Sequence, residues 1–565
     1  IELLRGASAL LYGSNAIGGA VNVIDRSIPT RSYAGASEAV FRSGYNSVND
    51  GWNTGALGIA GSESLSFQIN GFKRNADDYD APDGFVLDGT PRDKVLNSRG
   101  ESHSYGLGGS YLWDGGYAGL SFSQMENVYG VPGPHDLYET RVELETDRFE
   151  ARSEIEVFDS DWLRGIELNF GYGDYRHDEI GKIVAGTFKT HSSFLRDGIE
   201  ARTALVHEIG ALRGALGFHG LFDELEIQGD KTIFSGVVPA YSKAISSEDS
   251  TKLAIFLIEE FDLSESTRLN GGIRWEHYDR EFISEIADRD DSILSVSGGV
   301  SRDLAEGWNL SANLTYTERA PETSELYSNG PHHGSETFDV GNPALDIETA
   351  LGVEIILRRT LGKVTGQFSA FHTRFDNYVF QEQIPGTFID FDLPEPHALD
   401  RWQYKGADAD FRGLEAEIDW LAMENEGWSL LLSAYGDLLR AKNESEGTHL
   451  PRIPPARVGI GFEIQAEKLG FGMNLNRVFK QNRAPEDPHA DHGHGVVSEP
   501  NTAAFTLLNA SVTYDLNFSR SQSEIYLRGY NLTDELAKVH TSPESMKPFA
   551  PLPGAGVEVG LRIDF

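Results

Sequence analysis

The sequence has 565 residues, a formal net charge of −39 and no cysteine, which excludes disulfides, thiolate metal sites and cysteine nucleophiles. The surplus of 87 acidic over 48 basic residues argues against a nucleic-acid partner, because binding phosphates needs a basic surface. Glycine (61 residues) and aromatic residues (11%) favour a β-rich protein. The sequence has no apolar run of about 18 residues, so no transmembrane helix is predicted.

The chain opens with a glycine-rich stretch, IELLRGASALLYGSNAIGGAVNVID, over residues 1–25. Its glycines permit turns that bulkier residues resist, and the pattern of residues 20–24 (AVNVI) predicts a short strand. A nucleotide-binding loop is not indicated, because the stretch has neither GK[ST] nor GxGxxG and no helical pattern follows it. The simpler interpretation is a tight turn in a compact subdomain. Since the chain starts abruptly and without methionine, we expect it to be truncated at the N-terminus.

Alternation of apolar and polar residues with a period of two recurs along the rest of the chain. It is clear in residues 65–70, 165–173, 308–317 and 556–565, where one face is apolar and the other carries charged or small groups. A soluble sandwich can alternate in this way, but a transmembrane barrel also needs strands of about 9–11 residues with aromatic residues at the membrane interfaces. Closure into a barrel leaves no unpaired strand edge in lipid. The pattern therefore favours a membrane barrel.

Connections between these segments alternate between short and long. Residues 517–523 form a short connection, whereas residues 128–146 and 479–505 form long acidic ones, as expected for periplasmic turns and outer loops. The remaining length allows about 22 strands, the size class of plugged outer-membrane transporters. We predict an all-β protein: a transmembrane antiparallel β-barrel of about 22 strands over residues 31–565, preceded by the C-terminal end of a plug domain over residues 1–30.

Three parts of the chain resemble the TonB-dependent outer-membrane receptors. The matching motifs are Arg5-Gly6, Tyr12-Gly13, Ile17-Gly18-Gly19 and Val21-Asn22 at the end of the plug, residues 318–350 (ERAPETSELY onward) in mid-barrel, and LRGYNLTDE (527–535) with Phe565 at the C-terminus. The resemblance implies a protein in the outer membrane of a Gram-negative bacterium, surrounded by lipid and monomeric. It also implies active import: a solute binds between outer loops and plug, and the TonB energy-coupling complex pulls on the plug through an N-terminal segment that this sequence lacks.

A narrower resemblance points to the zinc-uptake branch of that family. It rests on YGVPGPH (129–135), YSNGPHHGSETFDVGNP (327–343), LPRIPPARVGIG (450–461), AKVHTSP (537–543) and APLPG (550–554). Members of this branch often carry His-rich loops and cysteine pairs, and this chain has histidine clusters but no cysteine. The resemblance implies zinc as the transported ligand and no resident cofactor.

The first candidate metal site is the stretch PEDPHADHGHG, in which His489, Asp491, His492 and His494 offer imidazole and carboxylate ligands that suit zinc. In an extended segment His492 and His494 would point the same way. Because only neutral imidazole binds metal, capture should weaken below a pH of about 6.5. The alternative is a solvated polar loop with adventitious metal affinity.

The second candidate site is NGPHHGSET, which offers His332, His333 and Glu336 near the top of the barrel, facing the plug. The alternative is a surface turn set by its glycines and proline. Two adjacent histidines in a strand would face opposite ways and could not both bind one ion.

Three readings of the function remain open on the sequence alone. Histidines with carboxylates favour import of free zinc, whereas loops lined by Arg and aromatic residues would favour a metal chelate such as a siderophore, haem or cobalamin. A passive porin or a barrel enzyme is the third. We do not expect an enzyme, because the chain has no GxSxG or HExxH motif and enzymes of this kind use smaller barrels without a plug.

Overall fold

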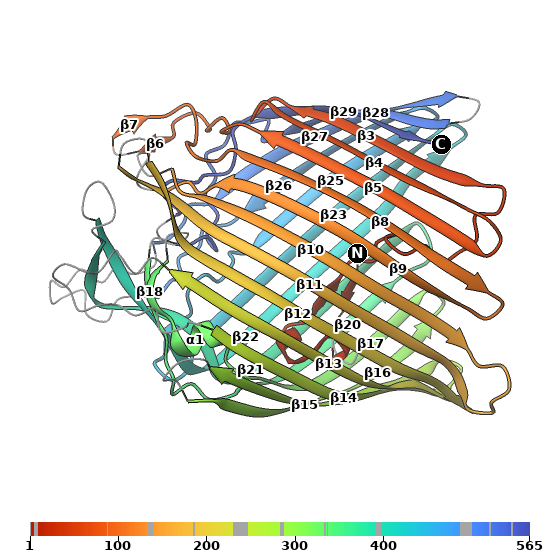
Figure 1. Cartoon of the computed structure of the whole chain (residues 1–565). Coiled ribbons are helices and arrows are strands. Elements are labelled where there is room, and N and C mark those ends of the chain that lie inside the picture. Colours follow the sequence, from red (N-terminus) through yellow and green to blue (C-terminus); the bar gives the residue numbers. More distant parts are fainter. Residues whose placement is uncertain are drawn as a thin grey trace.

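The computed structural model describes residues 2–4, 10–87, 89–133, 139–184, 187–229, 247–282, 287–332, 335, 337–390, 397–485, 500–518, 521–543 and 546–565. Over these residues the chain forms a closed barrel (Figure 1), whose wall has twenty-two strands in antiparallel neighbour pairs. The predicted fold class, a transmembrane barrel of about 22 strands, is confirmed. In the described ranges, no helix has the length and apolar character needed to cross a bilayer.

The wall strands follow one another around the barrel in chain order, and β29 pairs with β3 to close it. They are β3 (Ser37–Asn46), β4 (Gly51–Gly61), β5 (Leu65–Ala76), β8 (Gly100–Trp113), β9 (Gly116–Gly130), β10 (Arg141–Glu156), β11 (Leu163–Val184), β12 (Thr187–Ile209), β13 (Leu212–Gly229), β14 (Ser247–Ser264), β15 (Thr267–Phe282), β16 (Arg289–Ala305), β17 (Trp308–Arg319), β20 (Glu348–Arg359), β21 (Val364–Asp390), β22 (His397–Asn425), β23 (Trp428–Asn443), β25 (Arg457–Ala466), β26 (Leu469–Val478), β27 (Phe505–Phe518), β28 (Ser521–Tyr530) and β29 (Gly556–Asp564). The smaller elements are β1 (Glu2–Leu4), η2 (Ser14–Ala16), β2 (Ala20–Asn22), β6 (Val86–Leu87), β7 (Thr90–Pro91), α1 (Thr323–Tyr327), β18 (Asn329–His332), β19 (Thr337–Val340) and β24 (Thr448–His449).

The two faces of the wall separate the apolar from the polar side chains. On β5, Phe67 is 59% exposed on the outside, whereas its neighbours Ser66 and Gln68 are buried on the inside. The same outward, exposed positions are taken on other strands by Leu168, Phe170, Tyr172, Leu269, Ile273, Trp275, Leu310, Leu314, Val557 and Val559. An apolar exterior of this kind faces lipid in membrane barrels.

The two ends of the barrel differ. Turns at one end are short, and the C-terminus lies there; α1, β6, β7 and β18 lie at the other end (Figure 1). Membrane barrels have short periplasmic turns and long external connections, so we name these the periplasmic end and the outer end. The longest strands, β21 with 27 residues and β22 with 29, exceed the expected length of about ten. They continue pairing beyond what a bilayer requires, and the ladder hydrogen bonds keep their backbone satisfied there.

The beginning of the chain lies inside the barrel (Figure 1, dark red). There β1 and β2 form a small antiparallel sheet, with Glu2 opposite Asn22, and the short strand expected at residues 20–24 is confirmed over Ala20–Asn22. We name residues 10–24 the lumen segment. Ile17 in this segment packs against a buried cluster on the inner wall, which includes Phe375. The division of the chain into a plug end at residues 1–30 and a barrel at 31–565 stays a prediction.

After the lumen segment the chain runs along the inner wall before it joins β3. Ser110 Oγ donates a hydrogen bond to the carbonyl of Pro29, and Ser66 Oγ donates one to the carbonyl of Arg31 at 2.9 Å. A Cβ atom at position 108 would overlap the carbonyl oxygen of Ser27, so this close approach requires the glycine found there, Gly108.

Candidate functional site

The lumen segment is fixed to β15 by a buried ion pair. Ser14 Oγ donates a hydrogen bond to Glu276 Oε1 at 2.7 Å, and Arg274 Nη2 lies 2.7 Å from Glu276 Oε2. The Arg274 and Glu276 side chains are each only 3% exposed. Gly13, with φ of 99°, brings the segment against them. The hydroxyl of Ser14 therefore supplements a charge pair that is already out of water.

The same ion pair continues as a hydrogen-bonded chain along the inner wall, from β15 past β14 to β13 and β12. Arg274 Nη2 lies 3.0 Å from His219 Nδ1, and His219 Nε2 lies 2.9 Å from Glu200 Oε1. Because arginine has no acceptor, Nδ1 must accept this hydrogen bond, and Nε2 then carries the proton and donates to Glu200. The chain links β15 through β13 to β12.

At the outer end, Arg319 holds α1 to the wall. Its guanidinium contacts Glu325 of α1 at 2.9 and 3.2 Å and Glu348 at the start of β20 at 3.0 Å. Glu325 Oε2 also accepts the backbone N–H of Glu322 at 2.7 Å and completes a capping box. Glu348 Oε2 accepts the backbone N–H of Val379 on β21 at 2.9 Å. One arginine thus joins β17, α1, β20 and β21.

A second arginine supports the same segment from β15. Arg280 is fully buried, donates to the carbonyl of Pro321 at 2.7 Å and lies 2.5 Å from Asp291 Oδ2 on β16. Its guanidinium lies over the ring of Tyr278, 4.3 Å from the centroid. The segment between β17 and β20 is therefore held by two arginines, the fully buried Arg280 and the partly buried Arg319.

Two other outer connections are tied together. Tyr79 Oη donates to the carbonyl of Pro551 at 2.7 Å, and the backbone N–H of Asp83 donates to Asp534 Oδ2 at 2.8 Å. Burial raises the pKa of Tyr79 to about 12, so its hydroxyl stays neutral and keeps donating even at an alkaline pH at which an ordinary tyrosine ionises.

Of the seven predicted metal ligands, the structure describes one, His332, so the predicted metal sites stay predictions. The other six, His333, Glu336, His489, Asp491, His492 and His494, lie outside the described residues. His332 lies at the outer end, with Nε2 3.6 Å from Glu179 Oε1 and Nδ1 3.4 Å from Asp339 Oδ2. Within the described ranges, no group of three or more His, Asp and Glu side chains is arranged to hold a metal ion.

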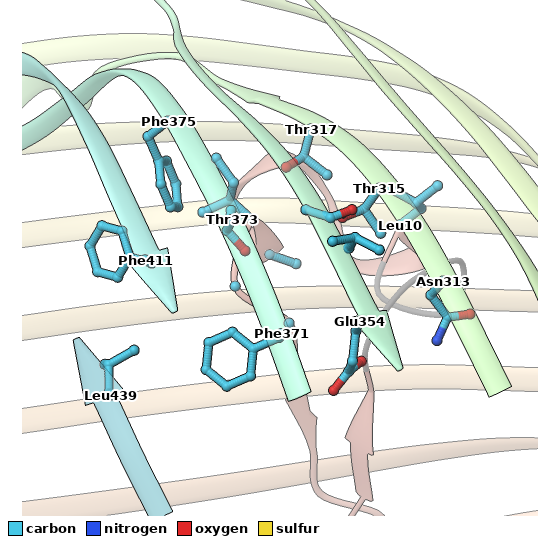
Figure 2. A pocket seen from close by; sticks show the side chains of 16 residues that line it. Leu10, Asn313, Thr315, Thr317, Glu354, Phe371, Thr373, Phe375, Phe411 and Leu439 are labelled. Atoms are coloured by element: carbon cyan, nitrogen blue, oxygen red, sulfur yellow. The ribbon is translucent and has the colours of Figure 1, made fainter. Parts of the chain in front are cut away.

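A pocket of about 330 Å³ separates the lumen segment from the inner wall (Figure 2). The wall contributes Phe371, Phe375, Phe411 and Leu439 on one side and the polar residues Asn313, Thr315, Thr317 and Glu354 on another. The lumen segment contributes Leu10 and Ala16–Gly19. The three polar residues of β17 confirm that its Asn and Thr face, predicted by alternation, points inward. This pocket can accommodate small apolar groups or side chains.

No pattern in the sequence marks the charged networks of the lumen and the outer end. Nothing in the sequence distinguishes Arg274, Glu276, His219 and Glu179 from the other polar residues that alternate with apolar ones along these strands. Arg274 and Glu276 are two residues apart on β15, but Ser14, which donates to Glu276, lies 262 residues away, and the partners of His219 and Glu179 also lie on other strands. Only the match of residues 318–350 to the mid-barrel signature marked Arg319 and Glu325 as part of a special segment.

Comparisons with known proteins agree with this architecture. The family described as "TonB dependent receptor-like, beta-barrel" matches residues 44–532. The iron-regulated outer membrane virulence protein of Vibrio cholerae is 24% identical over 95% of this chain and 76% of its own length. The ferric enterobactin receptor of Pseudomonas aeruginosa is 22% identical over 92% of this chain and 73% of its own length.

Among solved structures, the copper transporter OprC superposes with a TM-score of 0.77 at 17% sequence identity, over 94% of this chain and 80% of that protein. At this identity the likeness bears on the fold alone. These three relatives are named as receptors, transporters or outer-membrane proteins. The family match covers most of the chain, and the closed barrel presents an apolar exterior to lipid. The chain therefore belongs to the TonB-dependent receptors of the Gram-negative outer membrane.

Proposed function

We propose that this chain forms the channel of an active importer that carries a metal chelate, of the siderophore type, across the outer membrane. The observation that carries the proposal is a closed barrel whose lumen holds an anchored segment of the same chain. A passive porin needs an open water-filled lumen, whereas an occupied lumen requires energy to open. Two relatives that match over 90% of this chain are named for iron regulation and for ferric enterobactin.

The energy-coupling partner in this proposal is the TonB complex of the inner membrane. The cargo would bind at the outer end, where long connections surround the mouth of the lumen, and movement of the lumen segment would open a path past the inner wall. None of these steps requires a catalytic residue, so the proposed role is transport and not enzymatic.

The test compares a strain that lacks the gene with the same strain carrying the full-length gene. We expect a growth deficit under iron limitation that the gene repairs, and no repair in a strain without TonB. Expression should rise when iron is withheld. Repair that is independent of TonB would indicate a passive pore, and the absence of any deficit under iron limitation would overturn the chelate proposal.

A second candidate cargo is the zinc ion itself. It is favoured by the connection between β26 and β27, which leaves the barrel at the outer end and whose sequence includes His489, His492 and His494. Imidazole ligands suit zinc, and their affinity falls when they are protonated.

Replacing these three histidines together by alanine is the direct test of this second cargo. The variant should bind zinc more weakly than the parent protein at pH 7.5 in calorimetry, without a change in thermal unfolding, because β26 ends at Val478 and β27 begins only at Phe505. In that case zinc starvation, and not iron starvation, should raise expression. Unchanged zinc affinity would remove this loop from the site.

A further inference from the structure

A pocket of about 240 Å³ lies at the outer end, on the inner face of the extended strands β11, β12 and β13. The β18–β19 hairpin and the neighbouring β22 form its other sides. Its lining includes Glu179, Phe194, Ile227, His332, Asp339 and Tyr404. The pocket is separate from the one beside the lumen segment and faces the mouth of the barrel, where cargo would first arrive.

The negative charge of Glu179 in this pocket is poorly compensated. Its side chain is only 4% exposed, and in the described part of the chain its Oε2 atom makes no hydrogen bond. Among the residues that the structure describes, the ionic neighbour of its Oε1 atom is His332 Nε2 at 3.6 Å, which is too distant for a hydrogen bond. A carboxylate buried in this way is costly unless a cation or donors compensate it.

A second carboxylate adds to the same charge. Asp339 is buried beside His332, and its Oδ1 accepts a hydrogen bond from Thr337 Oγ1 at 2.8 Å. Over the described ranges, neither Glu179 nor Asp339 forms a salt bridge with an arginine or lysine. His332 is 45% exposed, so solvent weakens its interaction with both carboxylates.

The geometry suits a hydrogen-bond donor better than a metal ion. The two carboxylates approach different nitrogens of the His332 ring, so the three side chains do not converge on one point. A protonated amine has three donors and a charge that acts at longer range, and Phe194 and Ile227 provide apolar surface for the alkyl stem that carries it. The net charge of −39 would further attract a cationic solute.

We propose that this pocket binds a protonated amine on the cargo, with Glu179 as its main partner. The inference rests on the proposed function and narrows it: the preferred cargo is a metal chelate that bears a positively charged arm, in preference to one that is neutral or anionic.

The experiment uses two matched probes with the purified full chain in detergent. One is the ferric complex of desferrioxamine B, which ends in a free protonated amine, and the other is the same complex with that amine acetylated. Calorimetry should show about tenfold tighter binding of the amine form, as expected for one buried hydrogen-bonded charge. In Glu179→Gln the preference should disappear, because the amide keeps the shape and loses the charge.

The matched control is Glu226→Gln. Glu226 adjoins Ile227 on β13 but points to the opposite face of the sheet, and its Oε1 accepts from Gln228 at 2.9 Å, a bond that an amide oxygen preserves. This variant removes the same charge at the same level of the barrel and should keep the full preference. Asp339→Asn provides a second variant at the pocket, should Glu179→Gln fail to fold.

Equal affinity for the two probes, or no binding of either, would overturn the amine assignment. So would a preference that survives in Glu179→Gln, and so would zinc alone binding to the parent protein but not to this variant. These outcomes leave the growth test under iron limitation unaffected, so the failure of the amine pocket can be told apart from the failure of the transport proposal.

Discussion

Replacing Arg319 by alanine is expected to lower the free energy of unfolding by about 3–5 kcal/mol, because it leaves the buried Glu348 and the partly buried Glu325 without their cation. Glu325 and Glu348 both contact the Arg319 guanidinium, at 2.9 and 3.0 Å. Glu348 is almost fully buried, so water cannot replace the lost partner. The loss of local stability should be greatest where α1 meets the wall.

The measurement is urea unfolding in detergent micelles, combined with hydrogen exchange of the peptides that cover α1. The matched control is Arg358→Ala on β20, an exposed arginine that donates to Gln367 Oε1 at 2.7 Å and should cost less than about 1 kcal/mol. A variant with Arg319→Met, Glu325→Gln and Glu348→Gln together should recover most of the loss, since no charge stays buried. Equal costs for Arg319→Ala and Arg358→Ala would contradict the argument.

The barrel could be predicted from the sequence because its signal is local. A strand in a membrane wall must place every second side chain in lipid, so residues two apart carry the information, as with Leu65, Phe67 and Ile69 of β5. The same alternation puts Asn313 and Thr315 on the face opposite the apolar one, and they line the pocket beside the lumen segment. The number of strands follows from dividing the length of the chain by the length of one such segment with its connection.

The sites could not be predicted in the same way, because their contacts join distant parts of the chain. Glu179 and His332 meet only after β18 folds back over β11, and nothing near Glu179 in the sequence distinguishes it from a solvated glutamate. Clustered histidines are the signal for metal ligands in the sequence, and they include His332 but neither Glu179 nor Asp339, the carboxylates beside it. Strand lengths were also underestimated, because the bilayer sets a minimum for a strand and does not set where pairing ends.

The second large effect is expected from Arg274→Ala. This change leaves Glu276 charged, buried and without its ion-pair partner, and it removes the donor that orients His219. We expect a loss of about 3–5 kcal/mol, as for other broken buried pairs. The lumen segment should also loosen, because Ser14 is bound to the same carboxylate. A buried glutamate that takes up a proton would present a weaker acceptor to that hydroxyl.

The control for this prediction lies on the same strand and the same face. Arg268 is six residues from Arg274, is about half exposed and pairs with Asp262 at 2.8 Å; its replacement by alanine should cost at most about 1 kcal/mol. Hydrogen exchange of peptides within residues 10–24 distinguishes loosening of the lumen segment from the overall loss of stability. Faster exchange there in Arg274→Ala, but not in Arg268→Ala, shows that the ion pair anchors the lumen segment; equal exchange would contradict this.

Combining Arg274→Met with Glu276→Gln distinguishes anchoring from charge burial. The double variant removes both buried charges, so the free energy of unfolding should return most of the way to that of the parent protein. The amide oxygen at position 276 can still accept the hydrogen bond of Ser14, so protection of the lumen segment should return with it. If stability returns but the protection of the lumen segment against hydrogen exchange does not, the segment is held by the charge of Glu276. Any event in transport that neutralises this carboxylate would then release the segment.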